Sequence, residues 1–287
     1  MEPSPQTIAD ALRFGREQLA KTGSETPALD AEVLLRHVLG LDRTRLFVGL
    51  RDSIAPDAFA AYRGLVEQRA RGTPVAYLTS EREFMGLTFA VGPDVLVPRP
   101  ETEILVEWAL RWLAERKTAT IVDVGTGSGA IALSLAALAP PGLRATIIAV
   151  DLSPAALAIA ERNRDRLDLQ DRVSLVQGSL LAPITDPVNL ILANLPYLRP
   201  EQIADNPHLA AEPRLALDGG DDGLDLIRQF LPDTQRVLSP EGALGLEIDP
   251  GQRETVAALA RQVFPDADID VLPDLAGQDR HITIQTR

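Results

Sequence analysis

The sequence predicts an α/β protein with a seven-stranded, mainly parallel sheet, preceded by a small helical domain. From Ala119 onward, short apolar segments of strand length alternate with longer segments of helical periodicity, which is typical of a parallel sheet covered on both faces. Before Gly72 the apolar residues recur at helical spacing alone. The 287 residues exceed the roughly 100–200 of one domain, so a large domain and a smaller one are expected.

The N-terminal part, placed at residues 1–82, is predicted to be a helical bundle. Thr26-Pro27 gives an N-cap followed by proline at the first helical position, and Gly40 and Gly72 mark helix ends. The expected helices cover residues 8–19, 27–39, 42–47 and 56–71. No catalytic constellation occurs in this domain, so its expected role is recognition of a substrate or support.

Residues 83–98 are predicted to form a β-hairpin that links this bundle to a second domain at residues 99–287, because apolar residues alternate there around Gly86. A helix is expected to begin in Pro98-Arg99-Pro100-Glu101-Thr102-Glu103, where two prolines fix the backbone around Arg99. The remaining elements are predicted as strands at 120–124, 145–150, 173–176, 188–193, 243–248, 269–272 and 281–286, and helices at 128–139, 154–167, 224–238 and 253–264.

Composition excludes several classes of protein. The chain has no cysteine and three histidines, which excludes disulfides and thiol catalysis and argues against a metal site. A net charge of -13 argues against a protein that wraps nucleic acid, so no direct nucleic acid binding is expected. No apolar run approaches the roughly 18 residues of a membrane span, and residues 1–5 do not resemble a signal peptide. A cytoplasmic protein without membrane contact is expected.

Arginines outnumber acidic residues between positions 36 and 71. Such a surface is either an ordinary solvated helix face or a docking face for an acidic partner.

A glycine-rich turn follows the first strand of the second domain. Asp123-Val124-Gly125-Thr126-Gly127-Ser128-Gly129 lacks the lysine of a phosphate-binding P-loop and the spacing of a dinucleotide fingerprint. Asp151 ends the next strand, 22 residues beyond Gly129, near the ~20 at which an acidic side chain meets a ribose. Together these residues predict an adenosine-type cofactor. Asp123 is expected either to brace the loop or to meet the cofactor's amino group.

A second polar turn, Asn194-Leu195-Pro196-Tyr197, follows the apolar strand at 188–193. An amide oxygen, a carbonyl held extended by the following proline, and a flat ring suit the binding of a planar NH2 group. An ordinary strand exit is the alternative, since Asn and Pro are common in turns. If this strand lies beside the first one, Asn194 faces the glycine turn across the ligand crevice. No His or Lys is placed there for hydride chemistry, which favours methyl transfer to nitrogen from S-adenosylmethionine.

These segments resemble the HemK/PrmC family, the peptide chain release factor glutamine methyltransferases, over nearly the whole chain. The similar segments are 98–103, 123–130, 194–197, Glu212-Pro213, 218–223 and 274–280. The resemblance implies a Rossmann-like class I methyltransferase fold in which Gly125, Thr126, Gly127, Ser128, Gly129 and Asp151 hold S-adenosylmethionine, and S-adenosylhomocysteine as product. It implies that Asn194, Leu195, Pro196 and Tyr197 bind the glutamine of the Gly-Gly-Gln motif of class-1 release factors, with Arg99 nearby.

The chain departs from the family pattern at three places. Leu195 replaces a proline but still presents a carbonyl, Ser179-Leu180 replaces an acidic and an aromatic residue beside the adenine, and Asp249 replaces a glycine. Leu180 can still pack on a ring. An active enzyme is therefore expected.

Two rivals stay open at this stage. The same turn suits an amino-methyltransferase that acts on an exocyclic NH2 of a nucleic acid base. A catalytically inactive module that binds the cofactor and scaffolds a complex is the other.

Overall fold

The computed structural model describes residues 6–287, which divide into two compact units. One unit runs to Ser80 and includes Pro207–Ala211, and the second holds Glu81–Asn206 and Glu212–Arg287. Residues 1–5, on which the signal-peptide prediction rests, lie outside the described part. None of the helices in the described part is long and apolar enough to cross a membrane.

The described residues of the first unit form a bundle of five α-helices, four of them at the predicted places. Its helices are α1 (Ile8–Ala20), α2 (Pro27–Leu39), α3 (Arg43–Val48), α4 (Pro56–Ala70) and α5 (Val75–Thr79). Gly40 ends α2 in the left-handed conformation, as its position predicts. Thr26 precedes α2, but its hydroxyl donates to Asp30 (3.0 Å) instead of capping the backbone. Asp30 also pairs with Arg69 at 2.8 Å and so ties α2 to α4.

The predicted hairpin is present but shorter than expected. Its strands are β1 (Glu81–Phe84) and β2 (Leu87–Ala90), paired antiparallel. The stretch from Val91 to Arg99 is irregular, since Gly92, Pro93 and Pro98 interrupt strand pairing there.

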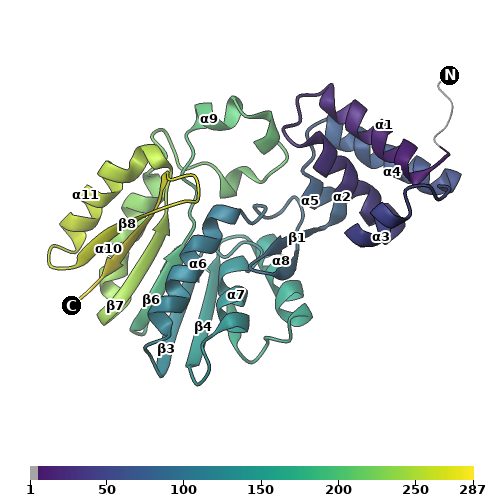
Figure 1. Ribbon diagram of the computed structural model, residues 1–287. Coiled ribbons are helices and arrows are strands. Elements are labelled where there is room, and N and C mark those ends of the chain that lie inside the picture. Colours follow the sequence, from purple (N-terminus) through teal and green to yellow (C-terminus); the bar gives the residue numbers. More distant parts are fainter. Residues whose placement is uncertain (1–5) are drawn as a thin grey trace. The chain divides into compact units, whose positions relative to one another are not determined.

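The second unit holds a seven-stranded sheet in the order β5-β4-β3-β6-β7-β9-β8 (Figure 1). The strands are β3 (Thr118–Val124), β4 (Arg144–Asp151), β5 (Val173–Gln177), β6 (Val188–Ala193), β7 (Leu238–Glu247), β8 (Asp268–Pro273) and β9 (Asp279–Gln285). The first five run parallel, whereas β9 is antiparallel to both β7 and β8. The seven-stranded, mainly parallel sheet is therefore confirmed.

Helices cover both faces of this sheet. One face carries α6 (Pro100–Leu113), α7 (Ala130–Leu138) and α8 (Pro154–Arg166), and the other carries α10 (Asp225–Val237) and α11 (Arg253–Val263) (Figure 1). Each face has its own buried apolar cluster. Gly245 in β7 lets α6 approach closely, because a Cβ there would lie 2.5 Å from Leu105 and 2.9 Å from Trp108.

The sequence did not predict several short helices, because one or two turns leave no readable periodicity. They are α5, α9 (Pro200–Ala204) and the 3-10 turns at Pro207–Leu209, Arg214–Ala216 and Pro250–Gln252. Leu215 and Ala216 in the turn at Arg214–Ala216 line a cavity in the second unit.

Asn163 on α8 is fully buried and links the hairpin to the glycine turn by hydrogen bonds. Its oxygen accepts from the backbone N–H of Ala90 (2.7 Å), and its NH2 donates to the carbonyls of Ala90 (2.9 Å) and Ser128 (2.8 Å). Three buried backbone groups therefore depend on one side chain.

Replacing Asn163 by Ala should lower the free energy of unfolding by about 3 kcal/mol, since a lost hydrogen bond that leaves a buried group unpaired costs about 1–3 kcal/mol. Urea denaturation measures this loss. Arg162→Ala changes an exposed neighbour on the same helix and should stay within about 0.5 kcal/mol of the parent. Equal stability of the two variants would contradict the linking role.

Candidate active site

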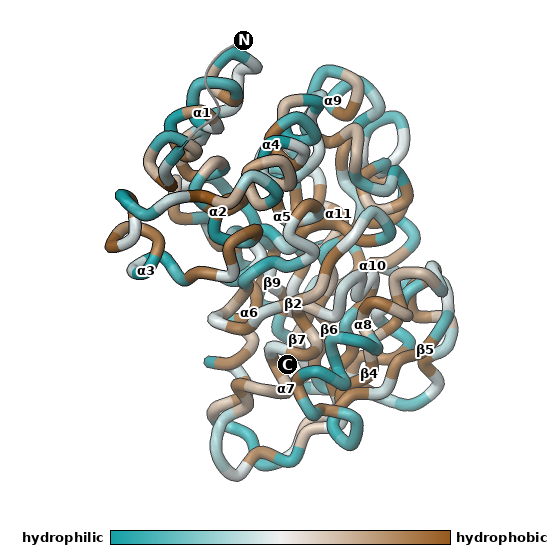
Figure 2. Tube along the Cα trace, turned by 90° about the vertical axis from the view of Figure 1, so that its right-hand side faces the viewer, coloured by the Kyte–Doolittle hydropathy of each residue, from teal (hydrophilic) through white to brown (hydrophobic). Residues whose placement is uncertain are grey.

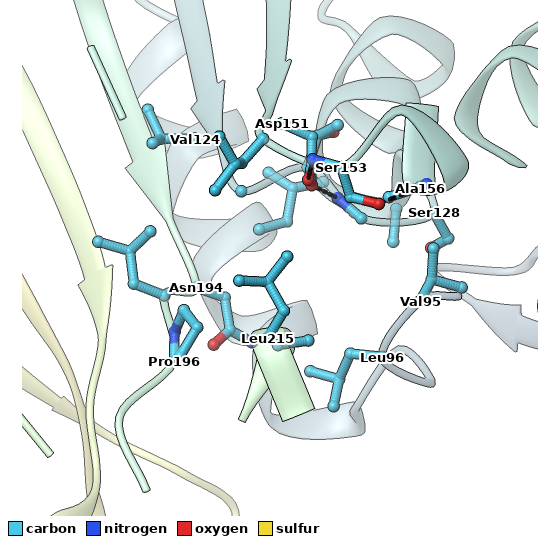
Figure 3. A pocket seen from close by; sticks show the side chains of 18 of the residues that line it. Val95, Leu96, Val124, Ser128, Asp151, Ser153, Ala156, Asn194, Pro196 and Leu215 are labelled. Atoms are coloured by element: carbon cyan, nitrogen blue, oxygen red, sulfur yellow. Dashed lines mark hydrogen bonds between the residues drawn. The ribbon is translucent and has the colours of Figure 1, made fainter. Parts of the chain in front are cut away.

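The carboxyl ends of β4, β3 and β6 meet around a cavity of about 270 Å³ in the second unit. The order of strands reverses beside β3, and ligands of doubly wound sheets bind at such a point. Asn194, Pro196 and Leu215 lie along one side of this cavity, and Asp151 and Ser153 along another (Figure 3). The crevice expected from the strand order is thus present.

The glycine turn connects β3 to α7 and lines the cavity. Gly125, Gly127 and Gly129 all have positive φ (73°, 55° and 83°), a conformation that other residues adopt only with strain. The N–H groups of Gly125 and Thr126 both donate to the carbonyl of Val150 on β4. Gly125, Thr126, Gly127 and Ser128 line the cavity, and the two glycines place no side chain there.

Asp151 ends β4 on the cavity wall. One carboxylate oxygen accepts from the N–H of Gly127 and the other from the N–H of Ser153, each at 2.8 Å. A carboxylate has lone pairs left after two such bonds. Asp151 therefore braces the glycine turn and can still accept from a ligand.

Asp123 lies beneath the turn and does not line the cavity. Its Oδ2 accepts from the hydroxyl of Thr126 (2.6 Å) and the N–H of Ala132 (3.1 Å), while Oδ1 has no hydrogen-bond partner among the described residues. Complete burial raises the pKa of Asp123 to about 7, although both hydrogen bonds act in the opposite direction. Of the two roles that the sequence allowed, its contacts fit the bracing of the loop.

The turn after β6 packs directly against the glycine turn. A Cβ on Gly125 would lie 3.4 Å from the side chain of Leu195 and 3.7 Å from the carbonyl oxygen of Asn194. Asn194, Leu195 and Pro196 line the cavity, but Tyr197 does not. The structure therefore brings three of these four residues to the cavity, and the predicted contact of Tyr197 with a substrate has no counterpart in this arrangement.

A buried polar chain lies behind the turn. The NH2 of Asn194 donates to the hydroxyl of Thr102 (3.1 Å), and that hydroxyl donates to Oε2 of Glu247 (2.6 Å). The hydroxyl of Tyr197 donates to the other oxygen of Glu247 at 3.1 Å. Burial and the Glu247 charge raise the pKa of Tyr197, so it keeps its proton. Sequence reasoning missed Thr102 and Glu247. Glu247 could have been proposed as a site residue from the sequence, because it is an acidic residue at the end of a strand, as Asp151 is.

Comparison with known proteins identifies the family. Residues 10–79 match the PrmC N-terminal domain and residues 115–262 a methyltransferase domain. A release factor glutamine methyltransferase from Moorella thermoacetica is 45% identical over 96% of each chain, and one from Deinococcus radiodurans is 40% identical over 96% of this chain and 97% of that one. The chain belongs to the release factor glutamine methyltransferase family.

The fold of this methyltransferase also matches a solved structure of low sequence similarity. The 16S rRNA N2 methyltransferase of T. thermophilus, in complex with AdoMet and guanosine, has a TM-score of 0.53 at 16% identity. The match covers 72% of this chain and 50% of that one. It shows the shared fold, and with the family it confirms the predicted class I methyltransferase.

The departures from the family pattern are accommodated in this methyltransferase. The Leu195 side chain is buried against Gly125, where it fills the space beside the glycine turn. Ser179 and Leu180 both line the cavity, and Leu180 has a φ of 49°, which is unusual for a branched side chain. Asp249 does not line the cavity and instead accepts from the N–H of Gly251 (2.9 Å) at the start of a 3-10 turn.

Arg99 lies at the rim of the cavity and forms an ion pair with the buried carboxylate of Glu212. Glu212 also accepts from the N–H of Val97 at 3.1 Å. The pair joins the loop before α6 to the segment after α9, so much of the charge of Arg99 is already balanced. In the sequence, Glu212 stood out only as part of a segment that resembles the family, and its ion pair with Arg99 was not predicted. Among residues 6–287 no group of three or more acidic or histidine side chains could hold a metal ion.

Asp123 makes the stability of the enzyme depend on pH. Its pKa of about 7 in the folded chain exceeds the value of about 3.9 for an unfolded aspartate. The folded state therefore binds more protons between these values, and this contribution to stability is lost as the pH rises to about 7. Between pH 5 and 8 the loss should amount to about 2–3 kcal/mol.

Asp123→Asn removes this titration and leaves an oxygen for the two observed hydrogen bonds. Urea denaturation at pH 5 and pH 8 should therefore show that the variant gains stability relative to the parent as the pH rises. Exposed Asp171 gives the control variant Asp171→Asn. Parallel pH profiles for parent and Asp123→Asn would refute the proton uptake.

Proposed function

We propose that this enzyme transfers the methyl group of S-adenosylmethionine to the side-chain amide nitrogen of the glutamine in the Gly-Gly-Gln motif of class-1 peptide chain release factors. The observation that supports this most is the orientation of Asn194. Its NH2 is bound to Thr102, and among residues 6–287 no group donates to its Oδ1. An acceptor oxygen is therefore left for a substrate N–H beside the glycine turn.

The residues of the cavity fit S-adenosylmethionine. Side-chain-free backbone at Gly125 and Gly127 suits close approach of a ligand, and Asp151 offers a carboxylate for ribose hydroxyls. Leu180 and Ile131 supply apolar surface for a flat ring. Bound S-adenosylmethionine would supply a methyl group on a positively charged sulfur. S-adenosylhomocysteine, the product, would occupy the same residues.

A glutamine amide is a poor nucleophile, because its nitrogen lone pair is delocalised into the carbonyl. We assign to Asn194 Oδ1 and the Leu195 carbonyl the binding of the two N–H groups, with Pro196 holding the Leu195 backbone extended. The lone pair of the nitrogen is then directed at the methyl group. The nitrogen–methyl bond forms as the sulfur–methyl bond breaks, and the methylated nitrogen afterwards releases a proton to water.

This mechanism depends on alignment and fixed dipoles rather than on a base. The side chains that line the cavity include no His or Lys. Apolar side chains also line the cavity, among them Leu96, Pro213 and Leu215, and Figure 3 shows Leu215 near Asn194. The two glycines of the Gly-Gly-Gln motif have no side chains, so this motif suits an apolar lining of this kind. We assign Tyr197 a supporting role through Glu247.

We propose that residues 1–82 recognise the release factor, with 83–98 as linker and 99–287 as the catalytic domain. Within the first unit, α3 presents Val48 (83% exposed) and Phe47 beside the exposed Arg43 and Arg45. Figure 2 shows both teal and brown residues at α3. A mixed basic and apolar surface suits an acidic protein partner, although Arg43 and Arg45 also pair with Glu32 and Asp42.

The main rival is methylation of an exocyclic NH2 on a nucleic acid base. The cavity alone does not discriminate, because a base amine offers the same two N–H donors. The net charge of -13 argues against it, since nucleic acid binding relies on clustered cations.

The experiment that tests the function offers labelled S-adenosylmethionine with three acceptors separately. These are a class-1 release factor, the same factor with its tip glutamine changed to Ala, and duplex or ribosomal RNA. Label on the unchanged factor alone is expected. Label on RNA would establish the rival, and no label on any acceptor would favour a cofactor-binding scaffold.

Replacing Asn194 by Ala should reduce kcat on the release factor by about 10²–10³, because one fixed acceptor of the reacting group is lost. Binding of S-adenosylhomocysteine, measured by calorimetry, should change by less than about threefold. Asp151→Ala is the matched contrast, in which ligand binding should fall at least about tenfold. An equal effect of Asn194→Ala on binding and turnover would contradict the assigned role.

A further inference from the structure

The amide of Asn194 is oriented by a chain of hydrogen bonds in which every donor points toward Glu247. Both oxygens of Glu247 accept, one from Tyr197 and one from Thr102. A threonine hydroxyl has one proton. Because that proton is given to Glu247, the hydroxyl can only accept from Asn194, so the group of Asn194 that faces Thr102 is the NH2.

The chain lies where water offers few alternative partners. Thr102 is 4% exposed, Glu247 is 1% exposed, and His281 beside them is fully buried. The ring of His281 lies 3.6 Å from Glu247, and neither of its nitrogens has a hydrogen-bond partner among the described residues. Thr102 and Glu247 have almost no access to water, so loss of the hydrogen bond between them would leave both side chains unpaired at a cost in stability.

The chain joins three separate elements, and a fourth lies beside it. Thr102 lies in the first turn of α6, Asn194 and Tyr197 follow β6, Glu247 ends β7, and His281 is its direct neighbour on β9. Pro100 at the start of α6 and the paired strands hold these elements at fixed backbone positions. The direction of the amide is thus set by Thr102 on α6 and, through it, by Glu247 on β7, rather than by the turn itself.

We propose that Thr102 and Glu247 are positioning residues, which lock the Asn194 amide with its oxygen facing the cavity and so select an acceptor that carries N–H groups. This inference rests on the proposed function for the identity of the substrate. The orientation of the Asn194 amide by Thr102 and Glu247, called the lock here, does not depend on the identity of the substrate. Without the Thr102 hydroxyl, the amide can turn over and present NH2 to the substrate, where two donors face each other.

The first measurement needs no release factor. The Asn194 side-chain NH2 signals are identified in a 15N–1H spectrum of the full chain as the pair that disappears in Asn194→Asp. In Thr102→Val, which keeps the shape but lacks the hydroxyl, these signals should shift and their exchange with water should rise about tenfold. In Thr102→Ser, which keeps a hydroxyl, they should stay close to those of the parent. Unchanged Asn194 signals in Thr102→Val would overturn the proposal.

The second measurement is the kinetics of methyl transfer to the release factor. Thr102→Val should lower kcat about tenfold, with KM for the factor and binding of S-adenosylhomocysteine changed less than threefold, and Thr102→Ser should recover most of this loss. In Glu247→Gln one acceptor becomes a donor, and the kcat of this variant should lie between those of Thr102→Val and Thr102→Ser. Thr234→Val removes another buried hydroxyl, on α10, and should keep parental activity.

The outcomes separate the two claims. Equal loss in Thr102→Val and Thr102→Ser, with equal thermal stability, would overturn the positioning role. If the parent enzyme does not label the release factor at all, the proposed function fails, and the Asn194 signals still decide whether the lock exists.

Discussion

The close approach of two backbone turns at one edge of the sheet is the constraint on which the rest of the structure depends. β3 and β6 are adjacent and parallel, so the glycine turn and the Asn194 turn leave the sheet side by side. Gly125 has a φ of 73°, which favours glycine, and a Cβ there would already be in van der Waals contact with Leu195 (3.4 Å) and the Asn194 carbonyl (3.7 Å). The cavity, the cofactor residues and the acceptor residues all follow from that contact.

Local signals were sufficient to predict much of this arrangement. Buried strands appear as short apolar runs, and the order of helices and strands limits the topology to a parallel sheet with few alternatives. Strand ends are also where ligands bind in such sheets, which is why Asp151 and Asn194 could be named from position alone. The family resemblance supplied the acceptor, which the residues themselves left open between a protein amide and a base amine.

The remaining features depend on pairings between residues far apart in the chain. Thr102 and Glu247 are 145 positions apart and Asn163 reaches Ala90 over 73, so no window of sequence contains both partners. Tyr197 illustrates the same limit. Its place next to Pro196 suggested a substrate contact, which stays a prediction. The hydrogen bond of its hydroxyl to Glu247, 50 positions away, could not be predicted from the neighbouring residues.

The turn after β6 can bind an NH2 group, but it does not choose the molecule that carries this group. Two acceptor oxygens would suit any planar NH2, whether from glutamine or from a nucleobase. The lock on Asn194 therefore explains why a nitrogen is methylated but not which nitrogen. That choice must come from surfaces outside the cavity. A net charge of -13 repels a nucleic acid backbone, whereas the mixed basic and apolar face of α3 suits a protein. The proposed function therefore assigns chemical selectivity to the cavity of the second unit and partner selectivity to the first unit.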